Sequence, residues 1–391
     1  MPTTLRDEAA IVGIGETEYS KNSKRSELQL GCEALRAAIA DCGVDPKEID
    51  GMSSFTMDST DEIELARALG IGELRFISKA HHGGGAATAT LHQAAMAVAT
   101  GAANYVVCYR TLNGRSGHRF SMGVSGELIT SDTIHYSWYM PSGLLTPASW
   151  VAMFHRRYAH KFGTTAEQLG HVAISIRDFA VTNPRAFFYQ RPIAMEDYLA
   201  AKWIVEPFRL YDCCQESDGA ACCVVTTPER ARDLRQKPAL IRGVAQGSGV
   251  DQEAMTSFYR EDIGAIPEMD LVARQVWEIS GLAPDDVDAA IIYDAFTAIV
   301  LWQLESFGFC KPGEAQEFAA SGGIARGGRL PTNTNGGQLS EAYIHGMNGV
   351  NEGVRLVRGE SANQPEKTVN HVLVTSGVGV PTSAMVIGRM D

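Results

Sequence analysis

The stretch CGVDPKEIDGMSSF, residues 42–55, is matched by SGLAPDDVDAAIIY, residues 280–293, in the second half of the chain. Each places a glycine after a helical segment, then an apolar residue, a proline at a turn, acidic residues and a short apolar strand. Glycine and proline in this order are typical of a helix end followed by a turn. The recurrence of the whole pattern predicts two similar halves.

The match extends to both sides of these stretches. Upstream, AAIVGIG (9–15) and ALIRGVA (239–245) each look like a buried strand followed by an amphipathic helix. Downstream, each half has a glycine turn, a helix of small residues and a buried strand: HHGGGAATATLHQAAMAVATG with YVVCYR, and NTNGGQLSEAYIHGMNGVNEGVRLVRG with HVLVTSGVG. This alternation predicts an α/β layered fold with largely parallel sheets.

The predicted organisation has two parts. Residues 1–237 form the N-terminal half, which includes an insertion at 111–237, and residues 238–391 form the C-terminal half. The insertion contains amphipathic helical patterns such as SWVAMFHRRYAHKFG (149–163). An insertion of this size is expected to cover a site.

Composition excludes several classes of function. The 391-residue chain has a net charge of -12, which argues against binding to nucleic acid or to an anionic membrane. No apolar run approaches the roughly 20 residues of a membrane span, and the N-terminus lacks the pattern of a signal peptide. The eight cysteines form no CxxC pair, and the histidines do not cluster with carboxylates. We therefore expect reduced thiols, no metal and a cytoplasmic location.

Three long segments, in order along the chain, carry a resemblance to a known family. They are SELQLGCEALRAAIADCG (26–43), PFRLYDCCQESDGAACCVV (207–225) and GGQLSEAYIHGMNG (336–349). With them the whole chain resembles the thiolase superfamily, and within it the sterol carrier protein X-type subgroup. The resemblance implies a layered α-β-α-β-α core with a loop-domain insertion in the first half.

The resemblance also locates the catalytic positions, and each has changed here. The nucleophilic cysteine of a thiolase falls at His82 or one residue from it, and its second cysteine at Gly377. The base histidine falls on Tyr343, and the histidine of a further motif on Tyr293. The chain is therefore not expected to form a cysteinyl acyl-enzyme. The two tyrosines become candidate proton-transfer groups, since a phenol can act as acid or base when its pKa is tuned.

Supporting residues follow from the same alignment. Asp294 is expected to orient Tyr293 or to cap the following helix. His82 is a candidate substrate contact, and His345 is expected to support the site or pack beside it in preference to acting directly in catalysis. The flanking residues Cys213, Cys214, Asp218 and Gly219 are expected to be structural, with Asp218 and Gly219 shaping a turn between the halves.

Within the superfamily, GIGETEYSKNSKRSEL (13–28) and HVLVTSGVGVPTS (371–383) most resemble the steroid side-chain-cleaving aldolases of actinobacterial cholesterol and bile-acid degradation. The resemblance implies retro-aldol cleavage of a 17-hydroxy steroid with a three-carbon CoA-thioester side chain. The products are a 17-keto steroid and propionyl-CoA. Tyr343 is then expected to be the base on the 17-hydroxyl, ionising more readily than free tyrosine, and Tyr293 the donor near the enolate.

The resemblance further implies an assembly. Residues around 77–110 are expected to form a homodimer, flanked by two DUF35-type partners that combine a zinc ribbon with an OB-fold. The product would be a heterotetramer in which any zinc belongs to the partner. No cofactor is expected beyond the CoA of the substrate.

Other functions remain open at this point. The chain could be a non-catalytic acyl-CoA or sterol carrier or scaffold, or a 3-ketoacyl-CoA thiolase that uses an unassigned cysteine such as Cys310. Lys79 could form an imine, although a thioester enolate gains little from one. Candidate CoA contacts are Arg115, His118 and Arg119. The sequence decides neither sterol against bile acid nor the stereochemistry.

Overall fold

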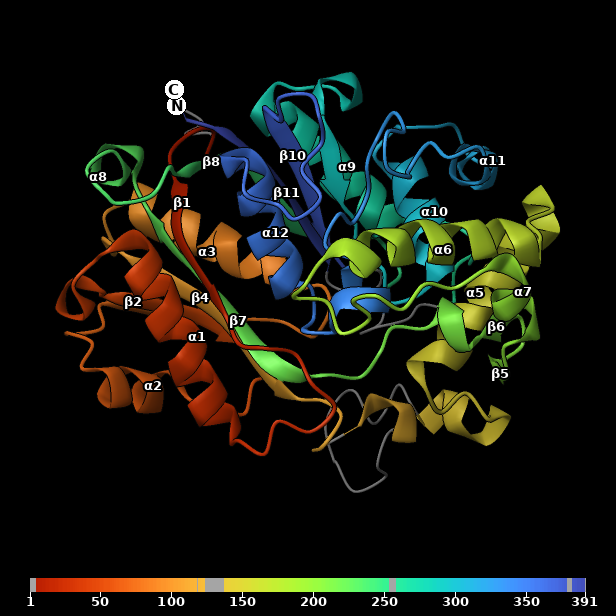
Figure 1. Cartoon of the computed structure of the whole chain (residues 1–391), viewed down its shortest axis with the longest axis horizontal. Helices are drawn as coiled ribbons and strands as arrows, with labels where there is room; N and C mark the ends of the chain where they lie inside the picture. The colour runs from red at the N-terminus through yellow and green to blue at the C-terminus, as the bar shows by residue number, and fades with distance from the viewer. Residues whose placement is uncertain (1–4, 118, 124–136, 253–257, 378–381, 391) are drawn as a thin grey trace.

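The structure is a computed structural model that describes residues 5–117, 119–123, 137–252, 258–377 and 382–390. Its centre is a nine-stranded sheet with the order β3-β2-β4-β7-β1-β8-β11-β10-β9 (Figure 1). The strands are β1 (Ala10–Glu16), β2 (Gly51–Phe55), β3 (Phe76–Ala80), β4 (Val106–Asn113), β7 (Asp218–Thr226), β8 (Ala239–Gly247), β9 (Ala289–Ile291), β10 (His371–Ser376) and β11 (Thr382–Arg389). A separate ribbon pairs β5 (Trp203–Val205) with β6 (Phe208–Arg209).

The repeated stretch forms the same local structure in both halves. Gly43 and Gly281 end the preceding helices in the left-handed region, with φ of 78° and 67°. A short 3₁₀ turn that begins with proline follows each glycine, at Pro46–Glu48 and at Pro284–Asp286. Glycine fits the left-handed helix end and proline fits the first helical position, so the local sequence dictates both turns.

The two halves of the sheet confirm the predicted duplication. The N-terminal half has the order β3-β2-β4-β7-β1, and the C-terminal half has the order β9-β10-β11-β8. Thr332 forms a parallel bridge to Ala290 of β9, in the place that β3 takes beside β2. The halves join where β1 pairs antiparallel with β8.

The prediction of largely parallel sheets is wrong. Only β2 with β3, β2 with β4, and β9 with β10 pair in parallel among the described strands. Each half inserts one strand, β7 or β11, antiparallel to the neighbours on both of its sides. Because β7 lies within 111–237, this stretch also contributes a strand to the sheet. All nine residues of β7 are buried, so its sequence lacks the alternation that marks a half-exposed strand.

Helices form the other layers, as the thiolase fold predicts. α1 (Glu27–Cys42) packs on β1, β4 and β7, and α9 (Pro267–Ser280) packs on β8 and β11. Between the two halves of the sheet lie α3 (Ala87–Ala99) and α12 (Met347–Arg358), which both contact strands from each half (Figure 1). Small residues allow this close approach: a Cβ at Gly353 would lie 2.8 Å from a methyl of Val374.

A group of helices around α6 (Ala166–Thr182) covers the outside of the C-terminal half. α6 contacts α10 (Thr297–Ser306), α11 (Ala315–Ala320) and a π-helical turn at Gly337–Glu341. The other helices are α2 (Glu62–Leu69), α5 (Pro147–Phe162), α7 (Met195–Ala200), α8 (Pro228–Ala231) and the 3₁₀ turns Phe120–Met122, Met140–Ser142 and Leu210–Asp212. Within the described ranges, no helix combines the length and apolar character that crossing a bilayer requires.

Candidate active site

The two tyrosines meet at the glycine turn that precedes α3. Tyr293 follows β9 and Tyr343 precedes α12, and the Tyr293 hydroxyl donates a hydrogen bond of 3.2 Å to the Tyr343 hydroxyl. The N-terminal half supplies Gly84, where a Cβ atom would lie only 2.1 Å from the Tyr293 hydroxyl oxygen. The site therefore joins the two halves of the molecule, and any side chain at Gly84 would displace the phenol.

Gly377, which is expected at the position of the second thiolase cysteine, packs closely against the glycine turn 83–85. Gly377 has a φ of 76°, and a Cβ there would lie 2.6 Å from the backbone nitrogen of Gly85. Both constraints require glycine at Gly377. His82, on the same turn, is half-buried and lies beside His81, with ring centroids 4.5 Å apart.

Burial keeps both phenols neutral. It raises the pKa of Tyr293 well above its ordinary value, and the neighbouring Tyr343, Cys214 and Asp294 raise that pKa further. Burial also raises the pKa of Tyr343, although the hydrogen bond from Tyr293 and the charge of Arg110 act in the opposite direction. The expectation that Tyr343 ionises more readily than free tyrosine is therefore wrong, because desolvation outweighs the nearby donors.

Asp294 caps a different element from the one predicted. Its carboxylate accepts hydrogen bonds from the backbone N–H groups of Gln338, at 2.7 Å, and Leu339, at 3.3 Å. These belong to the π-helical turn Gly337–Glu341, whereas α10, the next helix in sequence, has no side-chain cap. Burial raises the pKa of Asp294 to about 7. Asp294 thus connects the segment of Tyr293 to the segment that leads into Tyr343.

Residues 215–217 hold the Tyr343 segment from the other side. The backbone N–H of Tyr343 donates to the Ser217 hydroxyl at 3.2 Å. The Gln215 backbone N–H donates to the Gln338 carbonyl, and its side-chain amide donates to the Glu341 carbonyl. The segment 215–217, just before β7, therefore fixes the backbone on both sides of the π-helical turn.

Asp218 and Gly219 begin β7 and do not form a turn between the halves. The Asp218 carboxylate accepts hydrogen bonds of 2.9 Å from the backbone N–H groups of Ser23, Arg115 and Ser116. The carboxylate thus holds two loops beside the sheet, because the buried start of a strand needs partners for the adjacent amides.

A buried charged pair supports His345. Arg110, inside β4, lies 3.2 Å from the carboxylate of Asp58, and both side chains are almost fully buried. The Arg110 Nε donates a 2.9 Å hydrogen bond to Nδ1 of His345, whose ring centroid lies 4.9 Å from that of Tyr343. Burial and the charge of Arg110 lower the pKa of His345 well below its ordinary value.

The sequence analysis did not identify Arg110 and Asp58. The signal was an arginine at the end of the buried strand YVVCYR, since a charge in such a place needs a buried partner. Cys214 is expected to be structural, yet its thiol lies close enough to both tyrosines to raise their pKa. Burial raises the pKa of the Cys214 thiol itself.

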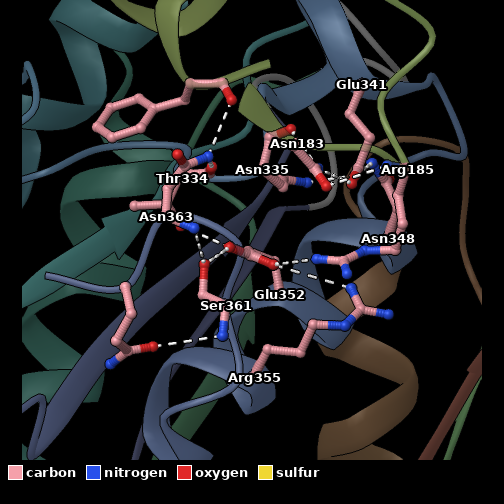
Figure 2. Close-up of polar contacts among 12 residues, drawn as sticks. Asn183, Arg185, Thr334, Asn335, Glu341, Asn348, Glu352, Arg355, Ser361 and Asn363 are labelled. Carbon is pink, nitrogen blue, oxygen red and sulfur yellow. Dashed lines mark hydrogen bonds and ion pairs between the residues drawn. The ribbon is translucent and has the colours of Figure 1, made fainter. Parts of the chain in front are cut away.

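A larger polar network surrounds Glu341, two residues before Tyr343 in the sequence (Figure 2). Glu341 accepts hydrogen bonds from the side-chain amides of Asn183, Asn335 and Asn348. Burial, together with the negative charges of Glu16 and Glu352, raises the pKa of Glu341 to about 8. Asn183 follows α6, so the network ties the insertion to the C-terminal half.

Glu352 of α12 forms the second centre of this network (Figure 2). It accepts hydrogen bonds from the hydroxyls of Thr334, at 2.7 Å, and Ser361, at 2.5 Å. Arg185 and Arg355 lie 3.7 and 3.8 Å from its carboxylate. Both arginines also pair with Glu16 of β1, which extends the network into the N-terminal half.

The other candidate residues make contacts outside the tyrosine pair. Lys79 is exposed and pairs with Glu62 at 3.4 Å, and Arg119 pairs with Glu216 at 2.6 Å. Burial raises the pKa of the Cys310 thiol to about 12, so it is no ready nucleophile. His118 lies outside the described residues. In the described part of the chain, no group of three or more histidine, cysteine, aspartate or glutamate residues could hold a metal ion.

Comparisons with known proteins place the chain among thiolase-like proteins. The family model "Thiolase C-terminal domain-like" matches residues 247–388. The steroid side-chain-cleaving aldolase of Thermomonospora curvata is 58% identical over 388 residues, which cover 99% of each chain. The 17-hydroxy-3-oxo-4-pregnene-20-carboxyl-CoA lyase of Mycobacterium tuberculosis is 54% identical over 386 residues, covering 98% of this chain and 100% of the relative.

A solved structure, described as an Ltp2-ChsH2(DUF35) aldolase, is 58% identical and superposes with a TM-score of 0.95 over 99% of both chains. The duplicated layered fold and the glycine-lined site define a thiolase-like protein. Within that class, the chain belongs to the family of the steroid side-chain-cleaving aldolases.

Proposed function

We propose that this chain is a carbon–carbon lyase that cleaves the three-carbon side chain of a 17-hydroxy steroid CoA thioester by a retro-aldol reaction. The products are a 17-keto steroid and propionyl-CoA. The observation that carries the proposal is the pair of tyrosine hydroxyls, 3.2 Å apart, packed against a glycine turn that lacks a cysteine nucleophile. The family of the chain supports this choice of reaction and substrate.

The neutral state of both phenols favours a proton relay over a free tyrosinate. In this mechanism Tyr343 accepts the 17-hydroxyl proton and passes its own proton to Tyr293. Tyr293 then delivers its proton to the enolate carbon. Phenol hydroxyl groups rotate to suit their partners, so the 3.2 Å hydrogen bond can run in either direction. The pair returns to its starting protonation state, and no base must ionise at neutral pH.

The bond that breaks leaves its electron pair on the thioester side chain as an enolate. Stabilising an enolate requires hydrogen-bond donors placed in advance around its oxygen. The glycine turn of residues 83–85 and Gly377 can bring backbone N–H groups close to a substrate, because no side chain stands in front of them. The reaction needs no covalent intermediate and no cofactor beyond substrate CoA.

The proposed assembly is a homodimer flanked by two DUF35-type partners, with any zinc in the partner. The solved relative described as an Ltp2-ChsH2(DUF35) aldolase supports the partner. The eight free cysteines and the acidic composition are consistent with the cytoplasmic location that forms part of this proposal.

Mass spectrometry of the products tests the proposed function. The chain, co-expressed with a DUF35-type partner, is incubated with a 17-hydroxy steroid side-chain CoA thioester. We expect propionyl-CoA and the 17-keto steroid in equal amounts, without added CoA and with no loss of activity after borohydride treatment. A covalent acyl-enzyme or a requirement for free CoA would contradict the mechanism, whereas binding without turnover would favour the carrier function.

A further inference from the structure

His345 presents a hydrogen-bond donor to the site that the tyrosine mechanism does not use. Arginine side chains only donate hydrogen bonds, so Nδ1 of His345 must accept from Arg110 and carries no proton. A neutral imidazole then has its proton on Nε2. The ring is buried, and its lowered pKa keeps it neutral, so this tautomer is held in place.

The supporting charges make this arrangement rigid. Arg110 is pinned by Asp58 at 3.2 Å and also donates to the backbone carbonyls of Met57, at 3.3 Å, and Thr111, at 2.8 Å. Its guanidinium thus has several fixed acceptors, and Nδ1 of His345 is one of them. Asp58 is itself held by the Thr111 hydroxyl at 2.5 Å. A donor preorganised in this way needs little rearrangement when charge develops nearby.

The Nε2 atom faces the glycine turn. A Cβ at Gly83 would lie 3.5 Å from Nε2, while a Cβ at the next residue, Gly84, would lie 2.1 Å from the Tyr293 hydroxyl. Gly346, next to His345, packs against the Tyr293 ring, where a Cβ would lie 3.3 Å away. Among the described residues, none accepts a hydrogen bond from Nε2. The absence of a side chain at Gly83 leaves this donor open to a bound molecule.

We propose that His345 is a catalytic residue that donates the Nε2–H hydrogen bond to the thioester oxygen as the enolate forms, and that Arg110 and Asp58 position it. This rests on the proposed retro-aldol function. His345 transfers no proton: the electron pair of the broken C–C bond moves onto the thioester, and Nε2–H stabilises the oxygen that gains charge. A neutral imidazole is suited to this task because its proton is not lost to the enolate.

Two substitutions separate the donor from the rest of the side chain. In His345→Asn, the amide oxygen can still accept from Arg110, and asparagine tolerates the φ of 50° at this position, but the donor into the site is gone. In His345→Gln, the longer side chain can return an amide N–H to the site. Gly83→Ala is an independent test, since its methyl group would cover Nε2 without changing a titratable group.

The measurement is hydrogen–deuterium exchange at C2 of propionyl-CoA, followed by mass spectrometry in D₂O on the partner-bound enzyme. This exchange passes through the same enolate and needs no cleavage of a steroid: the C2 proton passes along the tyrosine pair to solvent water, and a deuteron returns to C2 by the same route. We expect His345→Asn to lower both exchange and the kcat of cleavage by about 10²- to 10³-fold, as for the loss of one oxyanion donor. Gly83→Ala should lower both as well, and His345→Gln should recover part of the loss.

His155→Asn is the matched control. His155 is also buried and neutral, because burial lowers its pKa, but it lies among the rings of Tyr158, Phe208 and Trp302. We expect His155→Asn to leave the rate of deuterium exchange at C2 unchanged when the rate is expressed per mole of folded protein.

The outcomes distinguish this proposal from the proposed function. If His345→Asn keeps wild-type exchange and kcat, or changes only KM, His345 is no enolate donor, even when the wild-type protein cleaves the steroid thioester. No exchange in the wild-type protein would also overturn the proposal, because the enolate would then not form here. If exchange depends on His345 but the protein does not cleave the steroid thioester, His345 is still an enolate donor, and the proposed steroid substrate is wrong.

Discussion

The hydroxyls of Tyr293 and Tyr343 share one hydrogen bond in a pocket where neither group ionises readily. A buried phenol is a poor base in isolation, because charging it costs desolvation energy. Passing a proton along a pair avoids this cost, since one phenol loses a proton as it gains another. At this scale the chemistry depends on the contact between the two hydroxyls more than on the pKa of either one.

Removing either hydroxyl should therefore stop the relay. We expect Tyr343→Phe and Tyr293→Phe each to lower kcat by about 10²- to 10⁴-fold, the usual contribution of general acid–base catalysis. Steady-state kinetics and thermal denaturation check this, and each variant should lose only about 1 kcal/mol of stability. Tyr158→Phe is the matched control, because it removes a buried hydroxyl bonded to Glu305 outside the site. Near wild-type kcat in both site variants would make the tyrosines packing residues.

Glu341 should make stability depend on pH. Its pKa is raised to about 8 in the folded chain, above the ordinary value of about 4.3 expected after unfolding. As pH rises through this window, the unfolded chain releases a proton that the folded chain keeps, so stability falls. The side chain of Glu341→Gln cannot ionise, so this variant does not lose stability in this way. We expect the difference in Tm, variant minus wild type, to become more positive as pH rises from 5.5 to 8.5.

Thermal denaturation at several pH values measures this difference. The exposed Glu64→Gln on α2 is the control and should show a constant difference in Tm. A constant difference for Glu341→Gln as well would mean that Glu341 is ionised throughout, held by the three amides around it.

At the scale of elements, the π-helical turn Gly337–Glu341 ends two residues before Tyr343 and positions its backbone. The Asp294 carboxylate holds this turn by two hydrogen bonds to its backbone N–H groups. Asp294→Ala removes both bonds to the turn. We expect it to lower kcat by at least tenfold with about 1 to 2 kcal/mol of stability lost, the range for a lost cap. Asp294→Asn keeps one acceptor and should fall between this variant and wild type.

Ser26→Ala is the matched control for this prediction. Ser26 caps α1 through a 3.1 Å bond to the Gln29 N–H, so the variant should lose comparable stability and keep kcat. Equal kcat losses in both variants would assign the effect of Asp294 to general destabilisation.

The elements also show what could be predicted from the sequence. Glycine and proline at Gly43, Pro46, Gly281 and Pro284 act through local backbone geometry, so the repeated turns and the two halves were predictable. The place of β7 was not, because a uniformly buried strand has no periodic signal. The contact of Arg110 with His345 joins residues 235 positions apart, and no local pattern encodes such a distance.

The pKa of Tyr343 was mispredicted for a similar reason. The tyrosine was recognised from the surrounding residues GGQLSEAYIHGMNG, but its burial is set by the whole pocket. Sequence identifies which groups are present at a site more readily than it identifies how much water reaches them.

At the scale of the whole molecule, β3 forms one edge of the described sheet and exposes Ile77, and α3, which packs on β3, exposes Met96. An apolar edge strand can pair with a second copy about a twofold axis. We expect Ile77→Lys to shift the proposed homodimer toward monomer, measured by size-exclusion chromatography with light scattering. Ile204→Lys, on β5, is the matched control and should stay dimeric. A dimer unaffected by Ile77→Lys would place the interface elsewhere.

The antiparallel seam between the two halves has a further consequence for the order of the chain. Ala10 of β1 and Gly388 of β11 both pair with Leu240, on its two sides, so they lie only about 10 Å apart. Figure 1 shows the two chain ends at this same edge of the molecule. A short linker could therefore join the N-terminus to the C-terminus. The chain could then be cut between the exposed residues Arg232 and Asp233 to give new termini. We expect such a circular permutant, with its halves in reverse order, to fold and to assemble the same tyrosine pair.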